Sequence, residues 1–349
     1  MVSKAKQKMS RRQYLLLIFL VILLLGVVFH KQLTTHLKIT LFITEEFPQI
    51  PIKPLGLISF GPFHEKVGLD SSNGRIVGDL FLPVDPDKRP ALILAMGVKT
   101  NEKDRPILLH FANTMARLGY VTFWPRLEVL DKGQSLPEEP ETFIESFKYL
   151  ANLESVDPKR ISYVGFSVGS STAFVAASDP KISDKVHGLV FFGGQFDIFE
   201  YLLSLATKTV KMNGLATPWN PDLDALNHAK GLLDTKGADQ VLKIFDVKEA
   251  SEAAVLLGKA PDDEILGLKK YSPKEYLGNF KAKIFILHDK SDTLVPYVES
   301  VKLSQALSED QIEGYLLIDL FDHVQPNRPI NIGELLKLYG FLYEVLTVL

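Results

Sequence analysis

Cysteine is absent from the 349-residue chain, and its absence removes several chemistries at once. Without thiols the protein has no disulfide, no cysteine nucleophile, no cysteine-ligated zinc and no iron–sulfur cluster. The remaining composition, 46% hydrophobic and 23% charged, is typical of a folded chain and long enough for one large α/β domain or two ordinary ones. The sequence therefore predicts a folded protein whose chemistry depends on other side chains.

Acidic residues are absent from positions 1–31, where six Lys and Arg residues lie. The rest of the chain holds 33 basic and 42 acidic residues, a balance that argues against binding to nucleic acid. No two histidines have ligand spacing on one element, and no Walker-type glycine loop occurs. We therefore expect no nucleic-acid partner, no metal and no cofactor.

An uncharged run at residues 14–29 follows five basic residues. Such a run spans about 24 Å as a helix, slightly less than the ~30 Å hydrocarbon core, and flanking residues can close the gap. The sequence predicts a basic cytoplasmic tail at 1–13 and a transmembrane signal-anchor at 14–30, with the catalytic domain outside the cytoplasm. The alternative is a cleaved signal peptide and a secreted protein, although no small-residue cleavage site follows the run.

Four prolines interrupt residues 31–63, which we interpret as a linker that packs partly on the body. From residue 64 onward, apolar runs alternate with helical stretches. The predicted strands are 76–82, 91–96, 120–124, 161–164, 186–192, 284–287 and 315–318, and the predicted helices include 106–118, 141–153 and 332–349. This alternation predicts an α/β domain over 64–349 with a mostly parallel, doubly wound sheet. Residues 197–280 break the rhythm and are predicted to form a helical insertion without strands.

The motif G-F-S-V-G at residues 165–169 lies between a predicted strand and a run of small residues at 170–177. A tight turn from strand to helix needs glycines where backbones crowd, and it lifts the central serine above the sheet. Ser167 is therefore the candidate nucleophile, and the backbone N–H of Val168 is a candidate oxyanion donor. A glycine-rich turn with a capping serine is the alternative.

A serine nucleophile requires a base and an acid that orients the base. Asp292 follows the predicted strand 284–287 and precedes a helix that begins near Pro296, which favours it as the acid. Asp289 is the competing candidate, and its position suits hydrogen bonds to turn amides. His323 follows the last predicted strand and is the only histidine after Asp292, so it is the candidate base if a triad is present.

These motifs together resemble the α/β-hydrolase superfamily over roughly residues 64–349. The segment L-H-D-K-S-D-T-L-V-P at 287–296 is similar to the H-G-x-x-D-x-x-V-P block of dienelactone-hydrolase-like and prolyl-oligopeptidase-like members. The resemblance implies Ser167 as nucleophile, Asp292 as triad acid and His323 as general base. It also implies that the insertion 197–280 is a lid over the site.

Two positions depart from the family pattern. Asp289 replaces the glycine of the H-G block, and residues 96–98 read M-G-V where the family often has His-Gly followed by an oxyanion residue. A backbone N–H serves whatever the side chain is, so Val98 remains a candidate second oxyanion donor. The dienelactone hydrolases proper use a cysteine nucleophile, and that activity is excluded here.

The sequence predicts a membrane-anchored serine hydrolase that cleaves a small-molecule ester, or less readily an amide or peptide, through an acyl-enzyme. A non-catalytic binding module and an acyltransferase on the same triad are the alternatives. Apolar side chains of the insertion either line an acyl pocket or bury the insertion on the body; they are Phe196, Phe199, Tyr201, Leu202, Leu203, Leu215 and Trp219.

Overall fold

The computed structural model describes residues 11, 12, 15, 19, 29–85, 87–97, 105–127, 139–247 and 249–349. The predicted tail at 1–13 and signal-anchor at 14–30 lie almost entirely outside these residues. Within the described ranges, no helix combines the length and the hydropathy that a membrane span requires.

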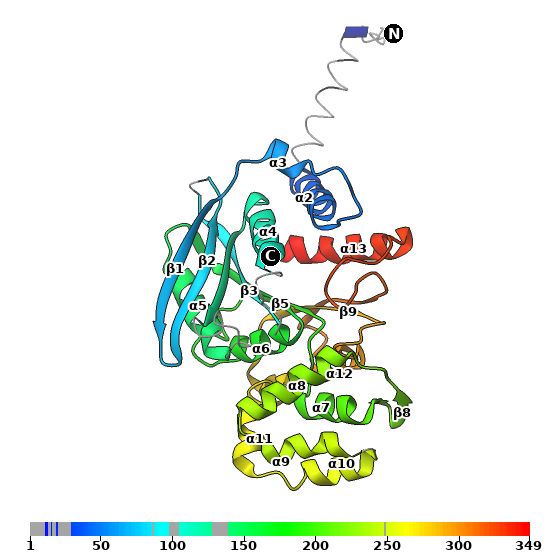
Figure 1. Ribbon diagram of the computed structural model, residues 1–349. Helices are drawn as coiled ribbons and strands as arrows, with labels where there is room; N and C mark the ends of the chain where they lie inside the picture. Colours follow the sequence, from blue (N-terminus) through cyan, green and yellow to red (C-terminus); the bar gives the residue numbers. More distant parts are fainter. Residues whose placement is uncertain are drawn as a thin grey trace, which may run out of the picture.

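One large sheet organises the molecule (Figure 1). Its strands are, in spatial order, β1 (Phe63–Ser71), β2 (Gly74–Leu82), β4 (Val121–Leu127), β3 (Arg89–Ala95), β5 (Val156–Phe166), β6 (Gly188–Phe192), β9 (Lys283–Asp289) and β10 (Ile312–Ile318). The pairs β1/β2 and β2/β4 are antiparallel, and every other pair is parallel. The loops that follow β3, β5, β6, β9 and β10 therefore leave the same edge of the sheet, where α/β proteins place their sites.

Both faces of the sheet are covered, as the continuous apolar runs predict. Along β3, Ala91 and Ile93 belong to the core that lies against α5 (Pro140–Ala151), α6 (Val168–Ala177) and α12 (Val298–Ala306). Leu92 and Leu94 point to the opposite core, which is closed by α2 (His30–Glu46), α4 (Arg105–Arg117) and α13 (Ile332–Val348). Because successive strand residues face opposite sides, one buried run supplies both cores. The prediction of a mostly parallel, doubly wound sheet is confirmed.

Residues 31–63 form more than a linker. Helix α2 (17 residues) begins one position before this segment, at His30, and occupies it as far as Glu46, and a short helix α3 (Leu55–Ile58) follows. Ile39 and Ile43, one helical turn apart, are buried in the core shared with α4 and α13. The helix ends at Glu46, just before the first of the prolines, at Pro48. The prolines therefore end this helix rather than preventing it.

The insertion forms a separate helical layer, drawn below the sheet in Figure 1. It holds α7 (Ile198–Thr207), α8 (Leu223–Thr235), α9 (Asp239–Leu242), α10 (Ala250–Leu257) and α11 (Asp262–Lys269), with 3₁₀ helices at Lys243–Asp246 and Pro273–Asn279. These elements enclose a core of their own, centred on Leu205, Leu233 and Val241.

The expectation that the insertion contains no strand is wrong. A hairpin of β7 (Thr209–Met212) and β8 (Leu215–Pro218) follows α7. The turn consists of Asn213 and Gly214, with φ of 51° and 78°. Asn-Gly is the dipeptide that best tolerates positive φ at both central positions of a two-residue hairpin, and the sequence did contain this signal.

Candidate active site

Ser167 lies on a sharp turn between β5 and α6, in the position expected of a nucleophile. Its backbone has φ 55° and ψ −142°, a sparsely populated region that costs a non-glycine residue about 1–3 kcal/mol. Its N–H donates to the carbonyl of Phe192 on β6 at 2.8 Å. Next in the helix, the Ser170 hydroxyl donates to the same carbonyl at 3.0 Å and accepts the Phe192 N–H at 3.1 Å. The strained turn is therefore fixed to the neighbouring strand.

Two glycines allow this turn to pack closely against the end of β3. A Cβ on Gly169 would lie 2.4 Å from the carbonyl oxygens of Ala95 and Met96, a contact that neither backbone can relieve. A Cβ on Gly97 would lie 2.8 Å from Cβ and 3.1 Å from Oγ of Ser167. Gly169 thus permits the helix to approach the strand, and Gly97 leaves the serine hydroxyl open.

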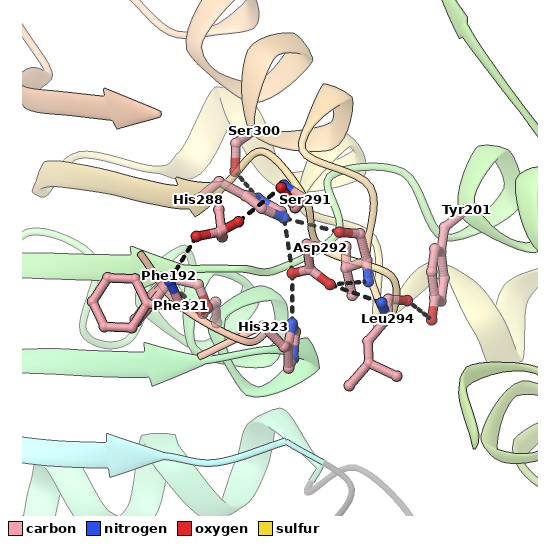
Figure 2. A network of polar contacts seen from close by, with 12 residues as sticks. Phe192, Tyr201, His288, Ser291, Asp292, Leu294, Ser300, Phe321 and His323 are labelled. Carbon is pink, nitrogen blue, oxygen red and sulfur yellow. Dashed lines mark hydrogen bonds and ion pairs between the residues drawn. The ribbon is translucent and has the colours of Figure 1, made fainter. Parts of the chain in front are cut away.

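Asp292 and His323 meet in the space between the loops after β9 and β10. Oδ2 of Asp292 is 2.5 Å from Nδ1 of His323, and both side chains are buried (Figure 2). Oδ1 of Asp292 accepts the N–H groups of Leu294 at 2.7 Å and Val295 at 2.9 Å. The carboxylate is therefore held by its own loop, and its second oxygen is directed at the imidazole.

A second imidazole, that of His288, contacts the same carboxylate. His288 Nε2 is 3.3 Å from Oδ2 of Asp292 and 2.9 Å from the Val295 carbonyl, while Nδ1 is 2.6 Å from the Ser300 hydroxyl. Figure 2 shows Asp292 between His288 and His323. The sequence places His288 at the end of β9, but no pattern along the chain indicates this contact.

The charge state of Asp292 follows from these neighbours. Burial by itself raises the pKa of the carboxyl group, because a desolvated carboxylate is unfavourable. The charge of His323 and the hydrogen bonds from both imidazoles outweigh burial and hold the pKa of Asp292 well below its usual range. The group therefore stays ionised and can stabilise a positive imidazolium at His323.

Asp289, the competing acid, has different partners. Its Oδ1 accepts the Ser291 N–H at 2.9 Å, and its Oδ2 accepts the N–H groups of Leu320 and Phe321, each at 2.8 Å. Arg328 lies 3.4 Å from Oδ1. Asp289 thus bonds turn amides, as the sequence suggests, and ties β9 to the loop that leads to His323.

The free face of His323 borders a cavity. Its Nε2 atom is buried and has no hydrogen-bond partner among the described residues. Ser167, Val168 and His323 all line one cavity of about 590 Å³, together with Met96 and Gly97. An unpaired buried imidazole nitrogen is costly in a finished structure, and it suits a group that exchanges a proton with a substrate-bound atom.

Of the two candidate oxyanion donors, only one lies within the described residues. Val168 is the first residue of α6, where backbone N–H groups have no partner inside the helix, and it lines the cavity. Val98 lies outside the described residues.

The insertion supports the acid loop more than it lines the cavity. Tyr201 of α7 donates its hydroxyl to the Leu294 carbonyl at 2.9 Å, and Trp219 donates Nε1–H to the Asp292 carbonyl at 3.2 Å. Of the seven apolar residues that were expected either to line an acyl pocket or to bury the insertion, Tyr201 alone borders the cavity in the described part of the chain. Leu202 is instead buried in the core of the insertion, and Leu215 is exposed.

Comparisons with known proteins agree with this architecture. The BD-FAE family model matches residues 143–307, which include Ser167 and Asp292. The comparison with curated proteins finds no significant match.

Among solved structures, a hyperthermophilic esterase from the archaeon Pyrobaculum calidifontis is 13% identical, with a TM-score of 0.51 over 83% of this chain and 86% of the esterase. An acylaminoacyl peptidase bound to Z-Gly-Gly-Phe-chloromethyl ketone is 16% identical, with a TM-score of 0.53. The Pyrococcus horikoshii acylaminoacyl peptidase is 14% identical, with a TM-score of 0.50. Each peptidase match covers 82% of this chain but only 41% of the peptidase. The sheet order, the turn at Ser167 and these likenesses show that this chain has the α/β-hydrolase fold.

Proposed function

We propose that the protein is a serine hydrolase that cleaves a carboxylic ester through an acyl-enzyme. The observation that carries the proposal is the arrangement at His323: Nδ1 faces the buried carboxylate of Asp292, and Nε2 is buried beside the cavity that Ser167 lines, with no hydrogen-bond partner in the described part of the chain. The match to the BD-FAE model and the esterase and peptidase neighbours support hydrolysis as the reaction type.

In the proposed mechanism, Ser167 Oγ attacks the ester carbonyl carbon while His323 Nε2 takes the hydroxyl proton. Asp292 stabilises the resulting imidazolium through Nδ1. The N–H of Val168, with Val98 as the second candidate, donates to the oxyanion of the tetrahedral intermediate. The intermediate collapses with cleavage of the carbon–oxygen bond, and the alcohol leaves with the proton from His323. Water then attacks the acyl-enzyme by the same steps and releases the acid.

A fluorophosphonate probe tests this assignment, because it phosphonylates an activated serine and releases fluoride. We expect the wild-type protein to be labelled and Ser167→Ala to lose both labelling and ester hydrolysis, since loss of a triad nucleophile costs many orders of magnitude. Ser308→Ala, at an exposed position outside the cavity, is the matched control and should behave like wild type. A folded wild-type protein that is not labelled would instead indicate a non-catalytic binding module.

The proposal includes a membrane anchor at residues 14–30, with the N-terminus in the cytoplasm and the hydrolase domain outside. The uncharged run behind five basic residues supports it. Apolar side chains also recur every four residues on the exposed side of α2 and its N-cap, at Phe29, Leu33 and Leu37, which are 48%, 59% and 54% exposed. Such a stripe suits a helix that continues along a lipid surface.

Resistance of the membrane fraction to carbonate extraction tests the anchor, and N-terminal sequencing of the mature protein tests cleavage. An intact N-terminus in carbonate-resistant membranes is the expected result. A mature start near residue 30 would instead identify a secreted protein.

A further inference from the structure

The cavity extends from Ser167 toward helices α2, α4 and α13, which cover one face of the sheet. Phe166, next to Ser167, meets Phe111 of α4 edge-to-face at 5.3 Å between ring centroids. Phe111 meets Phe42 of α2 in the same geometry at 5.9 Å. All three rings line the cavity, so an apolar wall leads from the candidate nucleophile to α2.

Helix α13 supplies the facing wall with one continuous stripe. The residues of this helix that line the cavity, together with Leu349 just after it, recur at spacings of three and four. They are Leu338, Phe341, Leu342, Val345, Leu346 and Leu349. Residues at these spacings lie on one face of a helix. This face therefore borders open space near the site and does not only fill the core.

The cavity is partly open to the surface, and it is much larger than the voids that packing leaves inside proteins. Protein interiors contain few voids larger than a water molecule, and side chains that line an empty void lose dispersion contacts. A cavity of about 590 Å³ lies instead within the usual range of ligand sites. The volume next to Ser167 therefore indicates a ligand with a matching apolar surface.

The polar groups of the cavity lie mainly elsewhere. Asp222, His228 and Thr293 line it on the side of the insertion. On the side formed by α2, α4 and α13, helix α2 contributes one acidic side chain, Glu46. Burial raises the pKa of this carboxyl group. Its carboxyl is therefore less readily ionised than an exposed one. One wall is thus suited to an alkyl chain and the other to a polar group.

We propose that the substrate is an ester with a long alkyl chain, and that this chain lies between α2, α4 and α13. This inference rests on the proposed hydrolase activity and names its substrate class. The chain can belong either to the acyl part or to the alcohol part of the ester, because both parts adjoin the carbonyl carbon that Ser167 attacks.

Two series of esters test the proposal on the wild-type protein. The first is p-nitrophenyl esters from acetate to laurate, and the second is acetate esters of alcohols of increasing length, all below their micelle concentrations. In the series that matches the bound chain, we expect kcat/KM to rise about threefold to fourfold for each methylene until the cavity is filled. The series that shows the rise identifies the part of the ester that occupies the cavity.

A variant of α13 locates the chain. Leu342→Trp fills the cavity from a half-buried position, and we expect it to lower the ratio of kcat/KM for long over short esters at least tenfold. Leu336→Trp is the matched control on the same helix, because Leu336 is 67% exposed and lies outside the cavity. If Leu342→Trp does not fold, labelling rates of the wild-type protein with short-chain and long-chain fluorophosphonates give the same comparison.

The outcomes separate this inference from the proposed function. Labelling by fluorophosphonate with kcat/KM constant or falling along both series would overturn the long-chain substrate and leave the hydrolase intact. Absence of both labelling and hydrolysis would overturn the hydrolase, and the long-chain substrate with it. An equal change in Leu342→Trp and Leu336→Trp would place the chain somewhere other than beside α13.

Discussion

Asp289 and Asp292 lie three residues apart at the end of β9, and both are buried, yet they have different partners. Asp289 accepts backbone N–H groups from its own turn and from the loop after β10. Asp292 accepts two N–H groups of its own loop with one oxygen and faces two imidazoles with the other. The same side chain thus holds a loop in one position and orients a titratable group in the other.

The difference shows that burial alone does not identify a catalytic acid. A carboxylate that is satisfied by fixed N–H groups contributes to structure, whereas one that faces an imidazole controls the tautomer and charge of that imidazole. Asp289 acts on His323 only indirectly, through the backbone of Leu320 and Phe321. Exchanging each carboxyl for an amide therefore separates the two roles.

Asp292→Asn should have the larger effect on catalysis. The amide favours the wrong tautomer of His323 and cannot stabilise the imidazolium, so we expect kcat for a responsive ester to fall by about 10³–10⁴ with the fold retained. Steady-state kinetics and near-ultraviolet circular dichroism measure the two quantities. Asp310→Asn, at an exposed turn, is the control. A loss smaller than tenfold would remove Asp292 from the proposed triad.

Asp289→Asn should affect stability more than chemistry. Its amide nitrogen would face N–H donors of Ser291, or of Leu320 and Phe321, and leave them without an acceptor. We expect the free energy of unfolding to fall by about 1–3 kcal/mol and kcat to fall by at most about 10², through misplacement of His323. Urea unfolding and kinetics measure both. A larger loss of kcat than in Asp292→Asn would reverse the two roles.

The sequence indicated much of the fold because buried parallel strands have a strong pattern. The runs at 91–96 and 284–287 are apolar on both faces, and the structure contains β3 and β9 there. Strand β1 escaped prediction because this antiparallel edge strand exposes most of its residues, among them Glu65 and Lys66. A strand that buries few of its side chains shows only a weak apolar alternation.

The sequence predicted only those residues of the candidate site whose place is fixed by the order of strands along the chain. Ser167, Asp292 and His323 follow β5, β9 and β10 in the order that the resemblance implies, and the parallel topology brings these loops to one edge. The contact of His288 with Asp292 depends instead on how the turn after β9 folds back. The apolar wall depends on which helices cover that edge, and the sequence offered only the insertion as a possible pocket lining, with burial of the insertion as the alternative.

The dependence of stability on pH tests the charge at Asp292. Its pKa is lower in the folded protein than the value of about 3.9 typical of unfolded chains. Its contribution to stability is therefore complete above the unfolded value and is lost as the pH falls from about 5 through that value toward the folded one. We expect the difference in unfolding free energy between wild type and Asp292→Asn, measured by urea unfolding from pH 7 to pH 3, to shrink as the pH falls. A constant difference would contradict an ionised carboxylate.

Of the three substitutions Asp292→Asn, Asp289→Asn and His288→Gln, we expect His288→Gln to have the smallest effect. The imidazole touches Asp292 at 3.3 Å, and its stronger contacts are with the Val295 carbonyl and the Ser300 hydroxyl. A glutamine amide can still donate from about the same position, so we expect kcat to fall threefold to tenfold, or about 1 kcal/mol, with KM unchanged.

His288→Leu is the variant with which the loss of kcat in His288→Gln is compared. It removes every polar contact of His288 and leaves the Ser300 hydroxyl and the Val295 carbonyl without this partner in a buried site, so its stability should fall more than that of His288→Gln. Measuring kcat and urea unfolding for both variants separates orientation of Asp292 from packing. If His288→Gln lowers kcat as much as Asp292→Asn does, then the carboxylate depends on both imidazoles, and the distinction between the two aspartates rests on His288 as well as on His323.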